Sequence, residues 1–210
     1  IMNHREKDIL YILSWHARVL SVEQIARGWW KSKATARRRA NDFLSAREQT
    51  GWLQVRELIS RPTMPLDSPL VTWQPGQRPP DFDELSRLLQ RRARTSPRKI
   101  KVATATRKTR QLFGAAGAAH RPKLTQISHD LFVSEVFLRY DANGLDIDRQ
   151  WVSEDHFPKD WPVRSRPDGL IRDEEGEIDR AVEYGGAYTI RRLSTLHAAL
   201  KSIPLPYEIW

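Results

Sequence analysis

The sequence contains no cysteine, which excludes disulfides, thiolate zinc sites and cysteine-based catalysis. No run of about 18 to 20 apolar residues, the length that spans a membrane, is present, and the chain does not open with the charged-then-apolar pattern of a secretion signal. Its glycines at 114 and 117 are not followed by the Lys-Ser/Thr of a phosphate-binding loop. These absences point away from secreted, membrane and nucleoside-triphosphate-hydrolysing proteins, and we expect a cytoplasmic protein.

Charge is distributed unevenly along the 210 residues, whose formal net charge is +9. Residues 1–120 carry 23 Lys/Arg and 10 Asp/Glu, whereas residues 121–210 carry 12 and 16. A basic half next to an acidic half predicts that one part of the chain meets a polyanion, and nucleic acid is the leading candidate. A membrane surface is a weaker candidate because no basic helix has a strongly apolar opposite face.

The basic half has the pattern of three helices followed by two strands. Apolar spacing predicts helices over 5–17, 22–28 and 33–48, and strands over 51–60 and 69–74. A capping box from Ser21 to Gln24 marks the start of the second helix. This order is typical of a winged helix-turn-helix, in which the third helix enters the major groove and the two-stranded wing follows a phosphate backbone. A further helix is expected over 82–94, capped by Asp81.

The outer face of the third helix and the basic residues near it are the candidate DNA contacts. Arg suits the edge of guanine and Asn that of adenine, so this helix could read bases as well as hold phosphates. The candidates are Lys33, Thr35, Arg37, Arg38, Arg39, Asn41, Arg61, Arg98, Lys99 and Lys101. Two alternatives stay open, because an Arg run can be a solvated helix face and a winged helix can bind protein instead of DNA.

Residues 95–122 are expected to connect the two halves. They are rich in Lys and Arg around Ile100 and Val102, and they include the small residues 114–119. We predict a basic linker with at most one short strand. It could touch phosphates beyond the winged helix, or it could be a solvated tether without a partner.

In the acidic half, one predicted hairpin brings two carboxylates together. Strands are expected on either side of the acidic turn 173–177, and a two-residue loop at Glu175 and Gly176 would place Asp168 opposite Glu183. Directly opposed residues have Cβ atoms about 5 Å apart. Two carboxylates at this separation repel unless a cation or a shared proton relieves them, so they are candidate Mg²⁺ ligands. The structural alternative is that they cap a turn and pair with Arg166 or Arg180.

The order expected in the acidic half is helix, three strands, helix, strand, and it resembles the core of the PD-(D/E)XK nucleases. Pro167-Asp168 matches the first motif element, and Glu183 matches the acidic residue of the Glu-X-Lys triplet. The resemblance implies that these two acids bind Mg²⁺. The Lys position of the triplet is Gly185, which departs from the pattern. Arg166 or Arg192 is then a candidate for the substitute cation. The resemblance also suggests Glu135 as a further acid.

Across both halves the chain is similar to the bacterial replication-relaxation family of plasmids and other mobile elements. The similarity is carried by residues 128–133, 166–169, 182–186 and 191–200. It implies a winged helix joined to a nuclease-like domain. We therefore expect an α+β protein with a winged helix-turn-helix over 1–94, a basic linker over 95–122 and a restriction-endonuclease-like α/β domain over 123–210.

The expected function is binding of double-stranded DNA, which needs no cofactor. Arg stays protonated and is a poor activator of water, so we expect that an Arg166 substitute leaves the nuclease site without cleavage. The acidic domain would then serve for homodimerisation or for docking a replication or transfer protein. The alternative is an active Mg²⁺-dependent endonuclease that uses Asp168 and Glu183.

Overall fold

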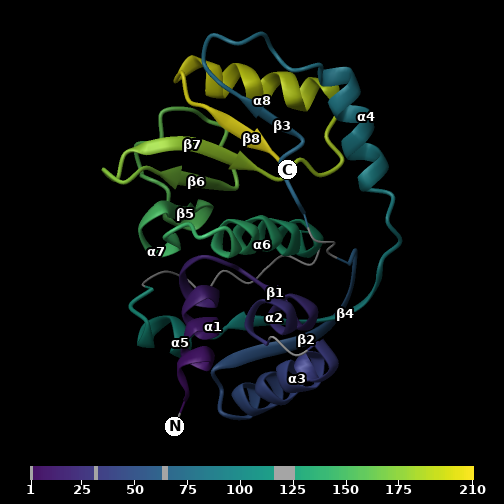
Figure 1. The fold of residues 1–210 in the computed structure, drawn as a ribbon, viewed down its shortest axis with the longest axis vertical. Helices are drawn as coiled ribbons and strands as arrows, with labels where there is room; N and C mark the ends of the chain where they lie inside the picture. Colours follow the sequence, from purple (N-terminus) through teal and green to yellow (C-terminus); the bar gives the residue numbers. More distant parts are fainter. Residues whose placement is uncertain (1, 31–32, 63–65, 116–125) are drawn as a thin grey trace. The chain divides into compact units, whose positions relative to one another are not determined.

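The computed structural model describes residues 2–30, 33–62, 66–115 and 126–210. Contacts divide the chain into two compact units that do not follow chain order. Unit 1 comprises Ile1–Met64 and Ser96–Leu138, and unit 2 comprises Pro65–Thr95 and Arg139–Trp210. Both helices and strands occur in each unit (Figure 1), which confirms the expected α+β class.

Unit 1 is built from helices and a three-stranded antiparallel sheet with the strand order β1-β4-β2. Its elements are α1 (His4–Trp15), β1 (Leu20–Ser21), α2 (Val22–Trp29), α3 (Lys33–Gln49), β2 (Leu53–Ser60), β4 (Arg98–Ala105), α5 (Arg107–Leu112) and most of α6 (Ile127–Ala142). The predicted capping box at Ser21 is confirmed, because the Ser21 hydroxyl accepts from the Gln24 N–H and the Gln24 side chain accepts from the Ser21 N–H.

Unit 2 contains a five-stranded sheet with the order β3-β8-β7-β6-β5, in which only the β7–β8 pair is parallel. Its elements are β3 (Val71–Trp73), α4 (Phe82–Arg92), α7 (Ile147–Gln150), β5 (Trp151–Ser153), the 3₁₀ turn η1 (Glu154–His156), β6 (Gly169–Arg172), β7 (Ile178–Glu183), α8 (Ile190–Ser202) and β8 (Tyr207–Ile209). Apolar side chains of α4 and α8 pack with those of the sheet in one core.

The prediction for the second strand of the ribbon is wrong. Residues 69–74 contain a strand, β3, but it pairs with β8 of unit 2. The partner of β2 is instead β4, which lies inside the predicted linker and pairs with β2 from Leu53↔Ala105 to Ser60↔Arg98. In β4 the buried Ile100 and Val102 alternate with Lys99 and Lys101, a period of two that marks a strand despite its charge.

The predicted domains 1–94 and 123–210 do not coincide with the two units, although the boundary predicted after residue 94 lies one residue from a change of unit. The helix predicted over 82–94 is present as α4, with its Asp81 cap, but it belongs to unit 2. The order α6-β5-β6-β7-α8-β8 reproduces the expected helix, three strands, helix, strand, although contacts assign Ile127–Leu138 of α6 to unit 1. The linker residues 116–122 lie outside the described residues.

Candidate nucleic-acid interface and acidic pair

Helix α3 directs one arginine outward and two to its flanks. Ala36, Ala40, Phe43 and Leu44 are buried and fix the inner face. Successive residues of an α-helix are about 100° apart, so Arg38 points away from the core while Arg37 and Arg39 lie on opposite sides. All three are exposed. Arg37 is in addition 3.3 Å from Glu23 of α2, and Thr35 is half-buried.

Asn41 is held inside unit 1 by two contacts. Its Nδ2 donates to the Arg37 carbonyl at 2.9 Å, and its Oδ1 accepts from Lys101 Nζ at 3.0 Å. These contacts use one N–H and one oxygen lone pair of the amide and hold its orientation within unit 1. Asn41 therefore joins α3 to β4, and this contact brings the outer face of the helix and one face of the ribbon into a single surface.

The two faces of the β2–β4 ribbon differ. Cross-strand partners share a face, so Ile59 with Lys99 and Glu57 with Lys101 lie on the face that contacts Asn41 of α3. On the opposite face, Leu58, Ile100 and Val102 pack with Ile127 and Leu131 of α6.

Arg98 lies on the face of the ribbon opposite to Lys99 and Lys101. Arg98 pairs with Ser60, whose hydroxyl is 2.8 Å from that of Ser128 on α6. The Arg61 N–H donates to the same Ser128 hydroxyl. Of the predicted DNA contacts in β4, Lys99 and Lys101 therefore lie on the α3 side of the ribbon and Arg98 on the other side. The Lys33 side chain lies outside the described structure.

The hairpin has the predicted register with a different turn. Gly169↔Val182, Leu170↔Ala181 and Ile171↔Arg180 are paired, and the next pair along this register is Asp168 with Glu183. The loop is longer than the two residues predicted, because the Asp173 N–H donates to the Glu177 carbonyl. A bulge at Asp179 restores the register beyond the turn.

Both carboxylates accept hydrogen bonds from the segment that follows β7. Asp168 Oδ2 accepts the Tyr184 N–H at 2.7 Å, and Glu183 Oε1 accepts the Tyr188 hydroxyl at 2.5 Å. The Arg192 guanidinium lies over the Tyr188 ring, 5.3 Å from its centroid. Glu183 is 2% exposed. The segment between β7 and α8 thus contacts both carboxylates, and Glu183 is buried whereas Asp168 is half-buried.

Burial and the nearby negative charge of Glu183 and Asp168 raise the pKa of the Tyr188 hydroxyl. Burial alone would lower the pKa of Arg192, but Tyr188, Glu183 and Asp168 around it raise that pKa overall. Arg192 is therefore the cation that interacts with both acids, whereas Arg166 is exposed. The sequence favoured Arg166 as the substitute cation and offered Arg192 second, whereas in the structure Arg192 is the arginine whose pKa responds to the two acids.

Gly185, where the resemblance expects a lysine, is crowded, and a side chain there would require its neighbours to shift. A Cβ atom there would lie 2.8 Å from Ile209 Cγ2 and 2.9 Å from Leu89 Cδ1. Helix α4, predicted to be part of the winged helix, supplies Leu89 and so closes this position. Glu135, the further acid suggested by the resemblance, contacts Gln24 and Arg27 inside unit 1.

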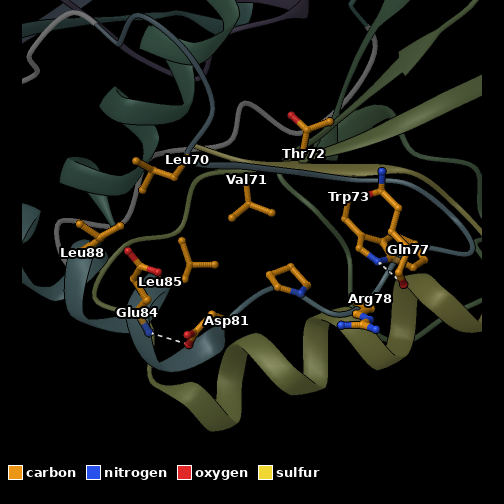
Figure 2. A pocket seen from close by; sticks show the side chains of 11 residues that line it. Leu70, Val71, Thr72, Trp73, Gln77, Arg78, Asp81, Glu84, Leu85 and Leu88 are labelled. Atoms are coloured by element: carbon orange, nitrogen blue, oxygen red, sulfur yellow. Dashed lines mark hydrogen bonds between the residues drawn. The ribbon is translucent and has the colours of Figure 1, made fainter.

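A pocket of about 430 Å³ lies between β3 and α4 of unit 2 (Figure 2). Val71, Leu85 and Leu88 line it, and its polar groups help to hold the local backbone. Asp81 caps α4 by accepting the Glu84 N–H, and Trp73 Nε1 donates to the Gln77 carbonyl. Asp81 and Trp73 of this pocket are thus engaged in local structure.

Within the described residues, no group of three or more His, Asp or Glu side chains is placed to hold a metal ion. The same residues form no helix that is both long and apolar enough to cross a membrane.

Sequence reasoning missed Tyr188 and Leu89. Tyr188 lies between the hairpin and the next helix, five residues after Glu183. This proximity in the sequence could have indicated a contact with the acidic pair. Leu89 had no such signal, because its contact with Gly185 joins segments far apart in the chain.

Comparison with known proteins found no matching family model, no matching curated protein and no matching solved structure.

Proposed function

We propose that unit 1 binds duplex DNA through α3 and the neighbouring face of the ribbon. The observation that carries this proposal is the hydrogen bond from Lys101 to Asn41. It joins the helix to the ribbon, so the exposed Arg38 and Lys99 flank one junction. Cations on both sides of such a junction could hold phosphates of a duplex. We call Arg38, Asn41, Lys99 and Lys101 the α3–ribbon surface.

The chain order of unit 1 supports a winged helix-turn-helix as the form of this DNA-binding unit. Three helices, α1 to α3, are followed by the antiparallel strands β2 and β4. In this interpretation β4 is the second wing strand, and the segment 61–97 between the wing strands includes β3 and α4 of unit 2. Base reading would fall to Arg38, since Asn41 is engaged.

We further propose that unit 2 is a nuclease-like domain without cleavage activity. The engagement of Asp168 and Glu183 by the segment after β7, together with the closed position at Gly185, supports this view. The resemblance to the replication-relaxation family suggests plasmid replication or transfer in a bacterium as the setting. Unit 2 would then act in homodimerisation or in docking a replication or transfer protein.

Fluorescence anisotropy with a labelled DNA duplex at 50 to 200 mM salt tests the DNA proposal. The logarithm of the binding constant should fall linearly with the logarithm of salt concentration. Arg38→Ala and Lys99→Gln should each reduce the slope by about one. Arg98→Gln is the matched control, because it removes one charge from the adjacent position on the other face. Equal effects of Arg98→Gln and Lys99→Gln, or no binding at low salt, would contradict the proposal.

Incubation with supercoiled plasmid and Mg²⁺ or Mn²⁺ tests the second part. We expect the plasmid to remain intact. Nicking that is lost in Asp168→Ala would instead support the Mg²⁺-dependent endonuclease.

A further inference from the structure

Ile59 is an apolar side chain left in solvent on the ribbon. It is 72% exposed, although it occupies a strand of a packed sheet. Its cross-strand partner is Lys99, and two residues further along β4 on the same face is Lys101. The same face carries Leu53, which is 2% exposed, so the burial of this face ends before Ile59.

Single exposed apolar residues are common and need no explanation by themselves. What distinguishes Ile59 is its surroundings, since it lies across from a lysine on the face that contacts α3. A partner that covers Ile59 would also meet Lys99. The surface therefore fits a ligand that combines negative charge with apolar edges, as DNA does with its phosphates, sugars and thymine methyl groups.

We propose that Ile59 makes an apolar contact with the DNA that Lys99 and Lys101 attract. This inference rests on the proposed DNA-binding function and adds a contact of a different physical kind. Lysine contacts with phosphates release counterions and weaken with salt. Burial of an isoleucine side chain removes apolar surface from water and does not depend on counterion release. Ile59 therefore contributes affinity that persists when salt screens the lysines.

The variant Ile59→Thr isolates this contribution. Threonine keeps the β-branched shape that favours a strand and replaces apolar surface by a hydroxyl. We expect the dissociation constant to rise roughly five- to twentyfold at every salt concentration, with the salt slope of the wild-type protein. Lys99→Gln, in contrast, should reduce the salt slope. Ile190→Thr, at a 46% exposed isoleucine of α8, is the matched control and should leave binding unchanged.

Anisotropy titrations of the three variants with one duplex, each over a salt series, measure these effects, and thermal unfolding verifies that each variant is folded. Wild-type affinity of Ile59→Thr would overturn the inference while leaving the DNA-binding proposal intact. So would a reduced slope, because Ile59 would then act through charge. Sedimentation that shows self-association of the wild-type protein, lost in Ile59→Thr, would assign Ile59 to contact between copies instead. Absence of binding by the wild-type protein at low salt would remove both proposals.

Discussion

Unit 1 carries 20 Lys/Arg and 8 Asp/Glu, whereas unit 2 carries 15 and 18. The difference extends to how the charged groups are used. On the α3–ribbon surface, Arg38 and Lys99 are exposed. In unit 2, the buried Glu208 accepts from Arg180 at 2.8 Å, from Trp210 Nε1 at 3.1 Å and from the Tyr140 hydroxyl.

Charged residues that form a recognisable pattern in the sequence are therefore used differently in the two units. Asp168 and Glu183 follow the paired register of β6 and β7, and each accepts a hydrogen bond from the segment after β7. A buried carboxylate is costly unless it is hydrogen-bonded, and these donors relieve that cost. The acidic pair of unit 2 is thus engaged within its own unit, whereas Arg38 and Lys99 of unit 1 are exposed.

The largest expected effect concerns which strands belong to unit 1. Because the chain has no cysteine, two introduced cysteines report on one contact. Glu57→Cys with Lys101→Cys should form a disulfide almost completely on mild oxidation, since directly paired strand residues fall within the Cα separation of a disulfide. Glu57→Cys with Thr72→Cys should form little, because β3 pairs with β8. Mobility on a non-reducing gel distinguishes the two, and cross-linking only in the second pair would restore the wing predicted from the sequence.

A smaller effect is expected at the closed position of unit 2. Gly185→Lys should lower the free energy of unfolding by about 1–3 kcal/mol, the usual cost of overpacking, because its Cβ meets Leu89 and Ile209. It should not confer plasmid cleavage. Gly186→Lys is the control, since a Cβ there meets nothing within 4 Å. Denaturant unfolding followed by tryptophan fluorescence measures both. Mg²⁺-dependent nicking by the Gly185 variant would show that the acids remain accessible.

The smallest effect tests the hydrogen bond that covers the acidic pair. Tyr188→Phe removes the donor to Glu183 and should cost about 1–2 kcal/mol of stability. If the two groups interact directly, Glu183→Gln and the double variant should complete a cycle with a non-zero coupling energy. Additive losses would mean that Tyr188 and Glu183 stabilise unit 2 independently.

Local patterns in the sequence predicted local structure correctly. The Ser21–Gln24 capping box and the inward residues of α3 place two helices. The register of the β6–β7 hairpin also agrees, although for a different reason. The three residues 174–176 form a longer loop, and the bulge at Asp179 compensates for the extra length.

Pairing between distant segments could not be predicted in this way. The composition of β3 suits a strand, but nothing local indicates that its partner is β8 and not β2. The position of Leu89 against Gly185 has the same origin. A short strand was expected around Ile100 and Val102, but nothing local indicated that this strand, β4, is the partner of β2. At the site, residue types were predictable, whereas the face of the ribbon on which Arg98 lies required knowledge of the β2–β4 pairing.

The chain passes between the units three times, after residues 64, 95 and 138. Neither unit is therefore one continuous piece of sequence, and no single truncation yields either of them whole. During synthesis, β3 and α4 would leave the ribosome before β7, α8 and β8, with which they form a core. Unit 1, in turn, cannot complete its sheet until β4, which follows β3 and α4 in the chain, has been synthesised. The completion of each unit therefore depends on synthesis of a segment of the other.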